Sequence, residues 1–487
     1  MTERWDEPLI AGALIPPGIE GATGRRSRPL PVDLLARELS RSRPRRIGAA
    51  RGLVPNTDPI DLASSGWGVL FPSTQRPEVR EALAPLLEHR RLQATASGQN
   101  LFREYHGKAG LHPGENRVQW TRRQGGGFGP VDPVKVPFYL LLVGNPREIP
   151  FELEHQLAVQ YAVGRLDFED PADYARYAQR VVQQERAQTT ESWPAITTFA
   201  AEHRDDITTR GLLDHLITPW LEACGRQRPH HPHHILTSAR ASKAALVGAL
   251  SSAPPKLLVT AGHGLLMGAQ APDQQALQGA LVCSGFEPSR ERREAVPESS
   301  YFAARDLPRT SFDGMVSLHV ACFSAGTPAT DSFALRESSD GQATIVPTPI
   351  APQPFVAELP KQLLRQGALA SVGHVDRAWG WGWVPSRFGA QAHTFHSALE
   401  EILAGRPVGY ACRFFGERHG ELSALLCDHL EQLQTGQISP DDRYLAYLWT
   451  ARNDARSWTI VGDPAVRLRS PSTAADPALA PSQAARG

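Results

Sequence analysis

"LLVTAGHGLLMG", which spans Leu257–Gly268, is the stretch of sequence that decides the fold. It begins with a run of apolar and small residues, a pattern typical of a strand buried on both faces of a sheet. The run leads directly into His263, which stands between two glycines. The open α/β folds place their functional residues just past the carboxyl ends of such strands. His263 is therefore a candidate functional residue.

The same pattern recurs along most of the chain. Apolar runs such as Phe138–Gly144 and Ala368–Val375 predict buried strands, and the segments Pro77–Ala94 and Asp170–Arg186 have the apolar spacing and start signals of helices. Strands that alternate with helices of ten or more residues predict an α/β fold with a mainly parallel sheet covered on both sides. No internal repeat is visible beyond this α/β alternation.

Composition shifts divide the 487 residues into four parts. Residues 1–60 are rich in Pro, Gly and Arg, which predicts an extended N-terminal arm. Residues 61–190 and 191–469 carry the alternating pattern and predict a smaller N-terminal α/β subdomain followed by a larger α/β domain. Residues 470–487 are rich in Ala, Pro and Ser, which predicts a disordered tail.

Bulk composition excludes several classes of function. The 51 Lys and Arg balance the 51 Asp and Glu, so there is no electrostatic case for binding nucleic acid or an acidic membrane. The five cysteines are scattered without a CxxC pair, which argues against a disulfide framework or a structural zinc and favours a reducing compartment. Neither a signal peptide nor a membrane span of ~18 apolar residues is visible. We expect a cytoplasmic protein without metal or cofactor.

A second strand end carries a cysteine. The segment "GMVSLHVACFSAG" (Gly314–Gly326) predicts a buried strand that ends at Cys322, 59 residues after His263. A thiol has a free pKa of ~8.5, and a histidine within reach can take its proton. The N–H groups of Gly264 and of Cys322 itself can then bind the oxyanion of a peptide under attack. Taken alone, however, a Gly-His-Gly triplet also suits a tight turn, and an apolar-strand cysteine also suits a core.

Several segments together resemble a known family. They are Leu257–Gly264, Leu318–Gly326, Tyr139–Pro150, Tyr161–Glu185, Gly373–Gly380 and Trp458–Leu468. These segments resemble the caspase-like cysteine peptidases, and most closely the branch that contains the gingipain-like and CHAT-domain peptidases. The resemblance covers roughly Phe138–Leu468.

The resemblance implies a caspase/gingipain-like three-layer α/β sandwich as a catalytic domain over residues 191–469, preceded by a smaller, related α/β subdomain. It implies hydrolysis of peptide bonds in protein or peptide substrates through a thioester intermediate. Cys322 would be the nucleophile and His263 the general base and acid, with the N–H groups of Gly264 and Cys322 as the oxyanion hole. A regulatory protein partner is a further expectation.

The segment "GHVDRAWG" (Gly373–Gly380) falls where that family places a wall of the pocket for the residue before the cleaved bond. The resemblance carries Trp379 to that wall. His374 in the same segment is a rival base for Cys322, and we expect it instead to have a structural or pocket-lining role. Asp376 in the pocket would favour Arg or Lys in the substrate, whereas Arg377 would favour an acidic residue; we expect the basic preference.

The chain also departs from the family. Gingipains are secreted and have an acidic residue at the base of that pocket, and the stretch Pro150–Gly164 is shorter here. Glu152 and Glu154 are the nearby acids, and neither aligns cleanly with the family's pocket residue.

Two other functions remain open at this stage. A catalytically silent caspase-like scaffold or signalling module would keep the fold without the activity. A metal-dependent hydrolase would use the histidines of "RPHHPHH" (Arg228–His234), although no carboxylate or cysteine stands at ligand spacing.

Three further features receive structural interpretations. His319, three residues before Cys322, is expected to be a buried and satisfied histidine, and Asp206 a helix cap. The long segment Leu266–Pro308 is a candidate lid or self-processing loop.

Overall fold

The computed structural model describes most of the chain. The described residues are 9–10, 13–14, 19–25, 30–31, 52–187, 192–204, 206–287, 294–331, 333, 335–337, 343–345, 347–379, 392–435, 437, 442–469 and 471. Most of the predicted arm (1–60) and nearly all of the predicted tail (470–487) lie outside these residues.

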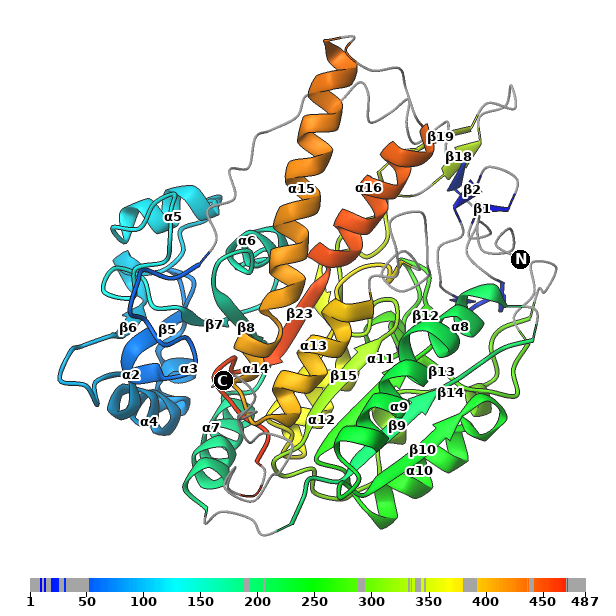
Figure 1. Cartoon of the computed structure of the whole chain (residues 1–487), viewed down its shortest axis with the longest axis horizontal. Helices are drawn as coiled ribbons and strands as arrows, with labels where there is room; N and C mark the ends of the chain where they lie inside the picture. Colours follow the sequence, from blue (N-terminus) through cyan, green and yellow to red (C-terminus); the bar gives the residue numbers. More distant parts are fainter. Residues whose placement is uncertain are drawn as a thin grey trace, which may run out of the picture.

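A ten-stranded sheet forms the centre of the molecule (Figure 1). In chain order its strands are β5 (Trp67–Leu70), β6 (Phe102–Tyr105), β7 (Tyr139–Val143), β8 (Ala162–Leu166), β9 (Ile196–Ala200), β10 (His233–Thr237), β11 (Leu257–Ala261), β15 (Val316–Val320), β22 (Ala370–His374) and β23 (Trp458–Gly462). In space their order is β10-β9-β11-β15-β22-β23-β8-β7-β5-β6.

The sheet consists of two parallel halves that run in opposite directions. Strands β10 to β22 are parallel to one another, β23 to β6 are parallel to one another, and β22 pairs with β23 antiparallel. The carboxyl ends of the strands in one half therefore lie at the opposite end of the sheet, along the strand direction, from those in the other half. All five residues of β7, β8, β9, β11, β15 and β22 are buried. Because successive side chains point to opposite faces, both faces are covered, and the predicted α/β fold with a mainly parallel sheet is confirmed.

The two halves repeat one strand order. The first half reads β6-β5-β7-β8 and the second reads β10-β9-β11-β15, so the sequence conceals a repeat that the topology shows. Even the ends of the third strands match: the Gly144 N–H donates to the Leu166 carbonyl at 3.0 Å, and the Gly262 N–H donates to the Val320 carbonyl at 3.1 Å. The strand order reverses between β9 and β11, which is where open α/β sheets form their sites.

Helices connect the strands. In the first half they are α2 (Leu62–Ser65), α3 (Pro77–Ala82), α4 (Ala84–Ala94), α5 (Arg117–Arg123), α6 (Phe151–Leu157) and α7 (Pro171–Arg186). In the second half they are α8 (Ile207–Leu212), α9 (Thr218–Gln227), α10 (Lys243–Ser252), α11 (Gln274–Leu277), α12 (Glu358–Arg365), α13 (Ala392–Leu403), α14 (Val408–Ala411), α15 (Arg413–Gln434) and α16 (Asp442–Arg456). No helix among the described residues is long and apolar enough to cross a membrane.

Short strands pair outside the main sheet. They are β1 (Leu9–Ile10), β2 (Ala13–Leu14), β3 (Ile19–Glu20), β4 (Leu30–Pro31), β12 (Leu265–Leu266), β13 (Leu281–Val282), β14 (Tyr301–Phe302), β16 (Gly326–Thr327), β17 (Thr330–Asp331), β18 (Leu335–Glu337), β19 (Ala343–Ile345), β20 (Thr348–Pro349) and β21 (Phe355–Val356). The pair β3–β12 attaches part of the N-terminal segment directly after Gly264, and Ile19 is fully buried there.

Two hydrophobic clusters matter for the site. The large one contains the buried faces of the main sheet in both halves. A smaller one lies between α15 and α16, which run side by side beyond the sheet (Figure 1), and it includes Phe333 and Trp379.

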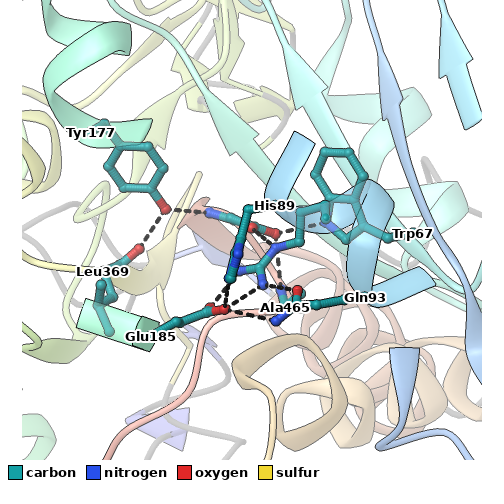
Figure 2. A network of polar contacts seen from close by, with 9 residues as sticks. Trp67, His89, Gln93, Tyr177, Glu185, Leu369 and Ala465 are labelled. Carbon is teal, nitrogen blue, oxygen red and sulfur yellow. Dashed lines mark hydrogen bonds and ion pairs between the residues drawn. The ribbon is translucent and has the colours of Figure 1, made fainter. Parts of the chain in front are cut away.

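A buried polar network joins the two halves where they meet (Figure 2). Asp463, just past β23, accepts hydrogen bonds from Trp67 Nε1 at 3.0 Å and Arg90 Nε at 2.7 Å. The Asp463 N–H donates to the Tyr177 hydroxyl, which itself donates to the Leu369 carbonyl, both at 2.7 Å. The network therefore connects β5, α4, α7 and the start of β22.

Candidate active site

His263 and Cys322 lie on adjoining strand ends, as the sequence predicts. Strands β11 and β15 are parallel neighbours in which Ala261 pairs with Val320. One residue separates each strand from His263 and Cys322 respectively. The register therefore brings the imidazole and the thiol to the same edge of the sheet.

Gly264 lies against the main chain of Cys322. A Cβ atom at this position would be 1.9 Å from the Cys322 carbonyl oxygen and 3.0 Å from its nitrogen. Since real Cβ contacts are never this short, only glycine fits without a movement of the Cys322 backbone. The glycine after the histidine is thus what allows the two loops to meet.

Asp206 completes a three-residue arrangement that sequence reasoning missed. It follows β9, the neighbour of β11, and its Oδ1 accepts the Thr208 N–H at 3.0 Å as the predicted cap of α8. Its Oδ2 contacts Nε2 of His263, and both side chains are buried. The signal in the sequence was an acidic residue, Asp206, just past a predicted strand. Because Asp206 also fits the role of a helix cap, its contact with His263 was not predicted.

The contact with Asp206 fixes the hydrogen-bonding state of His263. A carboxylate only accepts, so Nε2 carries the proton and Nδ1 keeps its lone pair when the ring is neutral. Nδ1 is buried and has no hydrogen-bond partner among the residues that the structure describes. In the neutral ring, Nδ1 is therefore the nitrogen whose lone pair can accept a proton.

The Cys322 thiol is covered in this structure. Its side chain is 0% exposed, and the Ala378 N–H donates to Sγ at 3.3 Å. Burial raises the pKa of the thiol to about 12, although the Ala378 N–H opposes this. The two strand ends thus adjoin as predicted, but the thiol is closed to solvent.

The residue after the cysteine has a strained backbone. Phe323 has φ +59°, in the left-handed region that bulky side chains avoid at a cost of about 1–3 kcal/mol. Its N–H donates to the Asp376 carbonyl, and the Ala325 N–H donates to the His374 carbonyl, both at 2.8 Å. These bonds hold the strained turn and place the segment after β22 alongside Cys322.

Asp376 and Arg377 lie in this neighbouring segment, both buried. Asp376 Oδ1 accepts the Arg377 N–H at 2.7 Å, and burial raises the pKa of the Asp376 carboxyl to about 6, with the charge of Asp331 adding to this. Arg377 Nη2 donates to Asp331 Oδ2 at 2.6 Å. The guanidinium thus has a carboxylate partner of its own.

His374 and Trp379 point toward the α15–α16 pair. The Trp379 ring lies 4.7 Å from that of Phe333, between centroids. The His374 ring lies 4.0 Å from that of Trp458, and its Nε2 is 3.4 Å from Asp454 Oδ1. The two predicted pocket residues therefore pack against neighbouring side chains of the α15–α16 region and β23.

Glu152 and Glu154 occupy different surroundings on α6. Glu154 is buried and forms an ion pair with Arg165 at 2.7 Å, so we do not carry it into the proposed pocket. Glu152 is exposed and lines a crevice with His112 and Arg147, formed largely by the loops after β5, β6 and β7.

Two other histidines that the sequence analysis considered, His319 and His233, are engaged in structural contacts. His319 is buried and bonds to Thr260 Oγ1 at 2.8 Å and Ser317 Oγ at 3.0 Å, as predicted. In "RPHHPHH", His233 begins β10 and bonds to Thr198 Oγ1 at 2.8 Å. Among the described residues no group of three or more His, Cys, Asp or Glu is arranged to hold a metal.

Comparison with known proteins gives a similarity to solved structures only. No protein-family model and no curated protein matches the chain. The chain is similar to the Arg-specific cysteine proteinase gingipain R, with a TM-score of 0.47 and 13% identity over 88% of this chain and 80% of that one. It is also similar to the complex of Porphyromonas gingivalis RgpB pro- and mature domains (TM-score 0.45, 12% identity, 82% and 79%).

A third similarity is to the Saccharomyces cerevisiae separase–securin complex (TM-score 0.32, 13% identity), over 67% of this chain and 15% of that one. At these identities the similarity concerns the fold, and we infer the roles below from this chain's own residues.

Proposed function

We propose that the chain is a cysteine endopeptidase. Cys322 attacks the carbonyl carbon of a substrate peptide bond while His263 Nδ1 takes the thiol proton. The tetrahedral oxyanion accepts hydrogen bonds from the N–H groups of Gly264 and Cys322. His263 then gives its proton to the leaving amine, which leaves a thioester on Cys322. Water activated by His263 hydrolyses the thioester, and the thiol is restored.

One observation carries this proposal: the imidazole of His263 is oriented on the strand end beside Cys322. Asp206 contacts Nε2, so the basic Nδ1 is the nitrogen left without a partner in the described part of the chain. His319, by comparison, has both ring nitrogens bonded to hydroxyls, whereas the buried His155 and His419 also leave Nε2 without a hydrogen-bond partner among the described residues. The contact with Asp206 and the place of His263 on the strand end beside Cys322, rather than the open Nδ1 alone, support a proton-transfer role for His263.

The substrate preference that we propose is for Arg or Lys before the cleaved bond. Asp376 supports it, because its carboxylate lies in the segment beside Cys322 and Arg377 is held by Asp331 instead. We place the enzyme in the cytoplasm, because no disulfide joins the described cysteines. A regulatory protein remains an expected partner.

A second function is favoured by the covered thiol. A catalytically silent scaffold would keep Cys322 buried in every state, and its full burial here supports that alternative. The two proposals differ in whether the thiol ever reacts.

A positional-scanning peptide library tests the proposal with wild type and Cys322→Ala. We expect wild type to cleave and Cys322→Ala to lose activity by at least about 10³-fold. Cys283→Ala is the matched control, because Cys283 is equally buried and burial raises the pKa of its thiol to about 12 as well. Wild type that cleaves no peptide and shows no iodoacetamide alkylation at Cys322 would favour the scaffold instead.

A further inference from the structure

Asp454 is a buried carboxylate at the base of the α15–α16 pair that the proposed mechanism does not use. Its Oδ1 accepts the main-chain N–H of Trp379 at 2.8 Å and lies 3.4 Å from His374 Nε2. Its Oδ2 accepts from Arg418 Nη1 on α15 at 3.3 Å. One side chain thus joins both helices to the two ends of the segment His374–Trp379.

That segment lies against the proposed nucleophile. Ala378, which precedes Trp379, donates its N–H to Cys322 Sγ at 3.3 Å, and its carbonyl oxygen lies 3.9 Å from the same sulfur. The hydrogen bond from Trp379 to Asp454 therefore fixes the residue directly after Ala378.

Further contacts hold the same segment from other sides. The Val375 N–H donates to the Ser457 carbonyl at 2.8 Å, and the Ser457 N–H donates to the Asp454 carbonyl at 3.2 Å. The Asp376 carbonyl accepts the Phe323 N–H at 2.8 Å. The segment is thus held by Asp454 and Ser457 on the side of α16, and by Phe323 on the side of Cys322.

We propose that Asp454 is a positioning residue that holds the segment His374–Trp379 against Cys322 and so sets access to the thiol and the width of the substrate cleft. This inference rests on the proposed function for its consequence in peptide cleavage, but its consequence for the thiol does not depend on it. The Ala378 main chain lies against Sγ, so its movement changes the access of a reagent or peptide to the thiol. The anchor at Trp379 restrains that movement.

Asp454 has two roles that substitutions can separate: it accepts a hydrogen bond from the Trp379 N–H, and its charge lies beside Arg418. Asparagine at position 454 would keep an oxygen that accepts the Trp379 N–H, whereas alanine would remove the acceptor. Arg418 depends on the charge instead, and its Nε and Nη2 have no partner among the described residues. An Asp454→Ala chain therefore leaves a buried guanidinium unpaired, which endangers folding.

Alkylation of each cysteine by iodoacetamide, followed by peptide mass spectrometry, tests the proposal on the full chain. We expect Asp454→Ala to speed alkylation of Cys322 by roughly tenfold, with Cys283 unchanged as the internal reference. Asp454→Asn should stay within about threefold of wild type. The double variant Asp454→Ala/Arg418→Met serves where the single variant does not fold, because it removes the unpaired charge. Glu421→Ala, an exposed charge on α15, is the matched control.

Peptide cleavage gives a second readout. Because Asp454→Ala removes the anchor of the segment His374–Trp379, it should raise KM for the peptide by roughly tenfold while kcat changes by less than about threefold. A folded Asp454→Ala or double variant whose Cys322 alkylation stays within twofold of wild type overturns the proposal. If wild type cleaves no peptide, the proposed function fails, and the alkylation rates alone still support or overturn the role of Asp454.

Discussion

A methyl group on Gly264 would lie 1.9 Å from the carbonyl oxygen of Cys322. Gly264→Ala therefore forces the two strand ends apart at the point where the proposed oxyanion hole forms. We expect kcat/KM for peptide cleavage to fall by at least about 10²-fold, as for the loss of one oxyanion donor. Initial rates with a fluorogenic peptide measure this.

Gly268→Ala is the control for that variant. Gly268 follows in the same loop, and a Cβ there would meet nothing within 4 Å. Its activity should match wild type. Equal activity of Gly264→Ala and wild type would remove Gly264 from the proposed site.

The contact between Asp206 and His263 leads to a second prediction. Asp206→Asn keeps an oxygen to cap the N–H of Thr208, but its amide can donate to Nε2 and so stabilise the wrong tautomer. We expect kcat/KM to fall by about 10²- to 10⁴-fold with little change in the thermal unfolding midpoint. Asp170→Asn is matched to it, because Asp170 caps α7 through Ala172 at 2.9 Å without touching a histidine.

Local patterns were sufficient to predict the strands that carry the site. The apolar run before His263 became β11, Phe138–Gly144 contains β7, and Ala368–Val375 contains β22. Each is a continuous apolar run, and burial on both faces requires little beyond that. The positions of His263 and Cys322 could be predicted as well, because neighbouring parallel strands have their carboxyl ends at the same end of the sheet.

Contacts between distant residues could not be predicted in this way. Ala378 is 56 residues from Cys322, and no local pattern shows that its main chain lies against the thiol. The reversal of direction between β22 and β23 depends on pairing over nearly ninety residues. Asp206 combines a capping bond, visible in sequence, with a contact to His263 that only the fold creates.

The network around Asp463 leads to a stability prediction. Asp463 and Arg90 are both buried, and Arg90 also pairs with Glu185 at 2.6 Å (Figure 2). Asp463→Ala leaves the donors of Trp67 and Arg90 without their acceptor, so we expect a loss of about 3–5 kcal/mol in the free energy of unfolding. Urea titration followed by fluorescence measures it.

An exposed ion pair on α4, the helix that carries Arg90, provides the comparison for Asp463→Ala. Glu88 and Arg91 lie 3.3 Å apart on α4 with side chains 61% and 48% exposed. Glu88→Ala should therefore change stability by less than about 0.5 kcal/mol. A similar small effect for Asp463→Ala would show that the network does not join the two halves.

The buried carboxyl of Asp376 makes stability depend on pH. Burial raises its pKa to about 6, whereas an aspartate in an unfolded chain titrates at about 3.9. Because the folded value is the higher one, the folded state binds the proton more tightly. Asp376 therefore opposes folding above pH 6, and this effect disappears as the pH falls below about 4.

Asp376→Asn removes this dependence while its side-chain oxygen still accepts the Arg377 N–H. We expect the variant to have a higher thermal unfolding midpoint than wild type at pH 8, and the two midpoints to converge near pH 4. Scanning calorimetry at pH 4, 6 and 8 measures the difference. A difference that is constant across this range, or that grows toward pH 4, would mean that Asp376 is ionised in the folded protein as readily as in the unfolded chain.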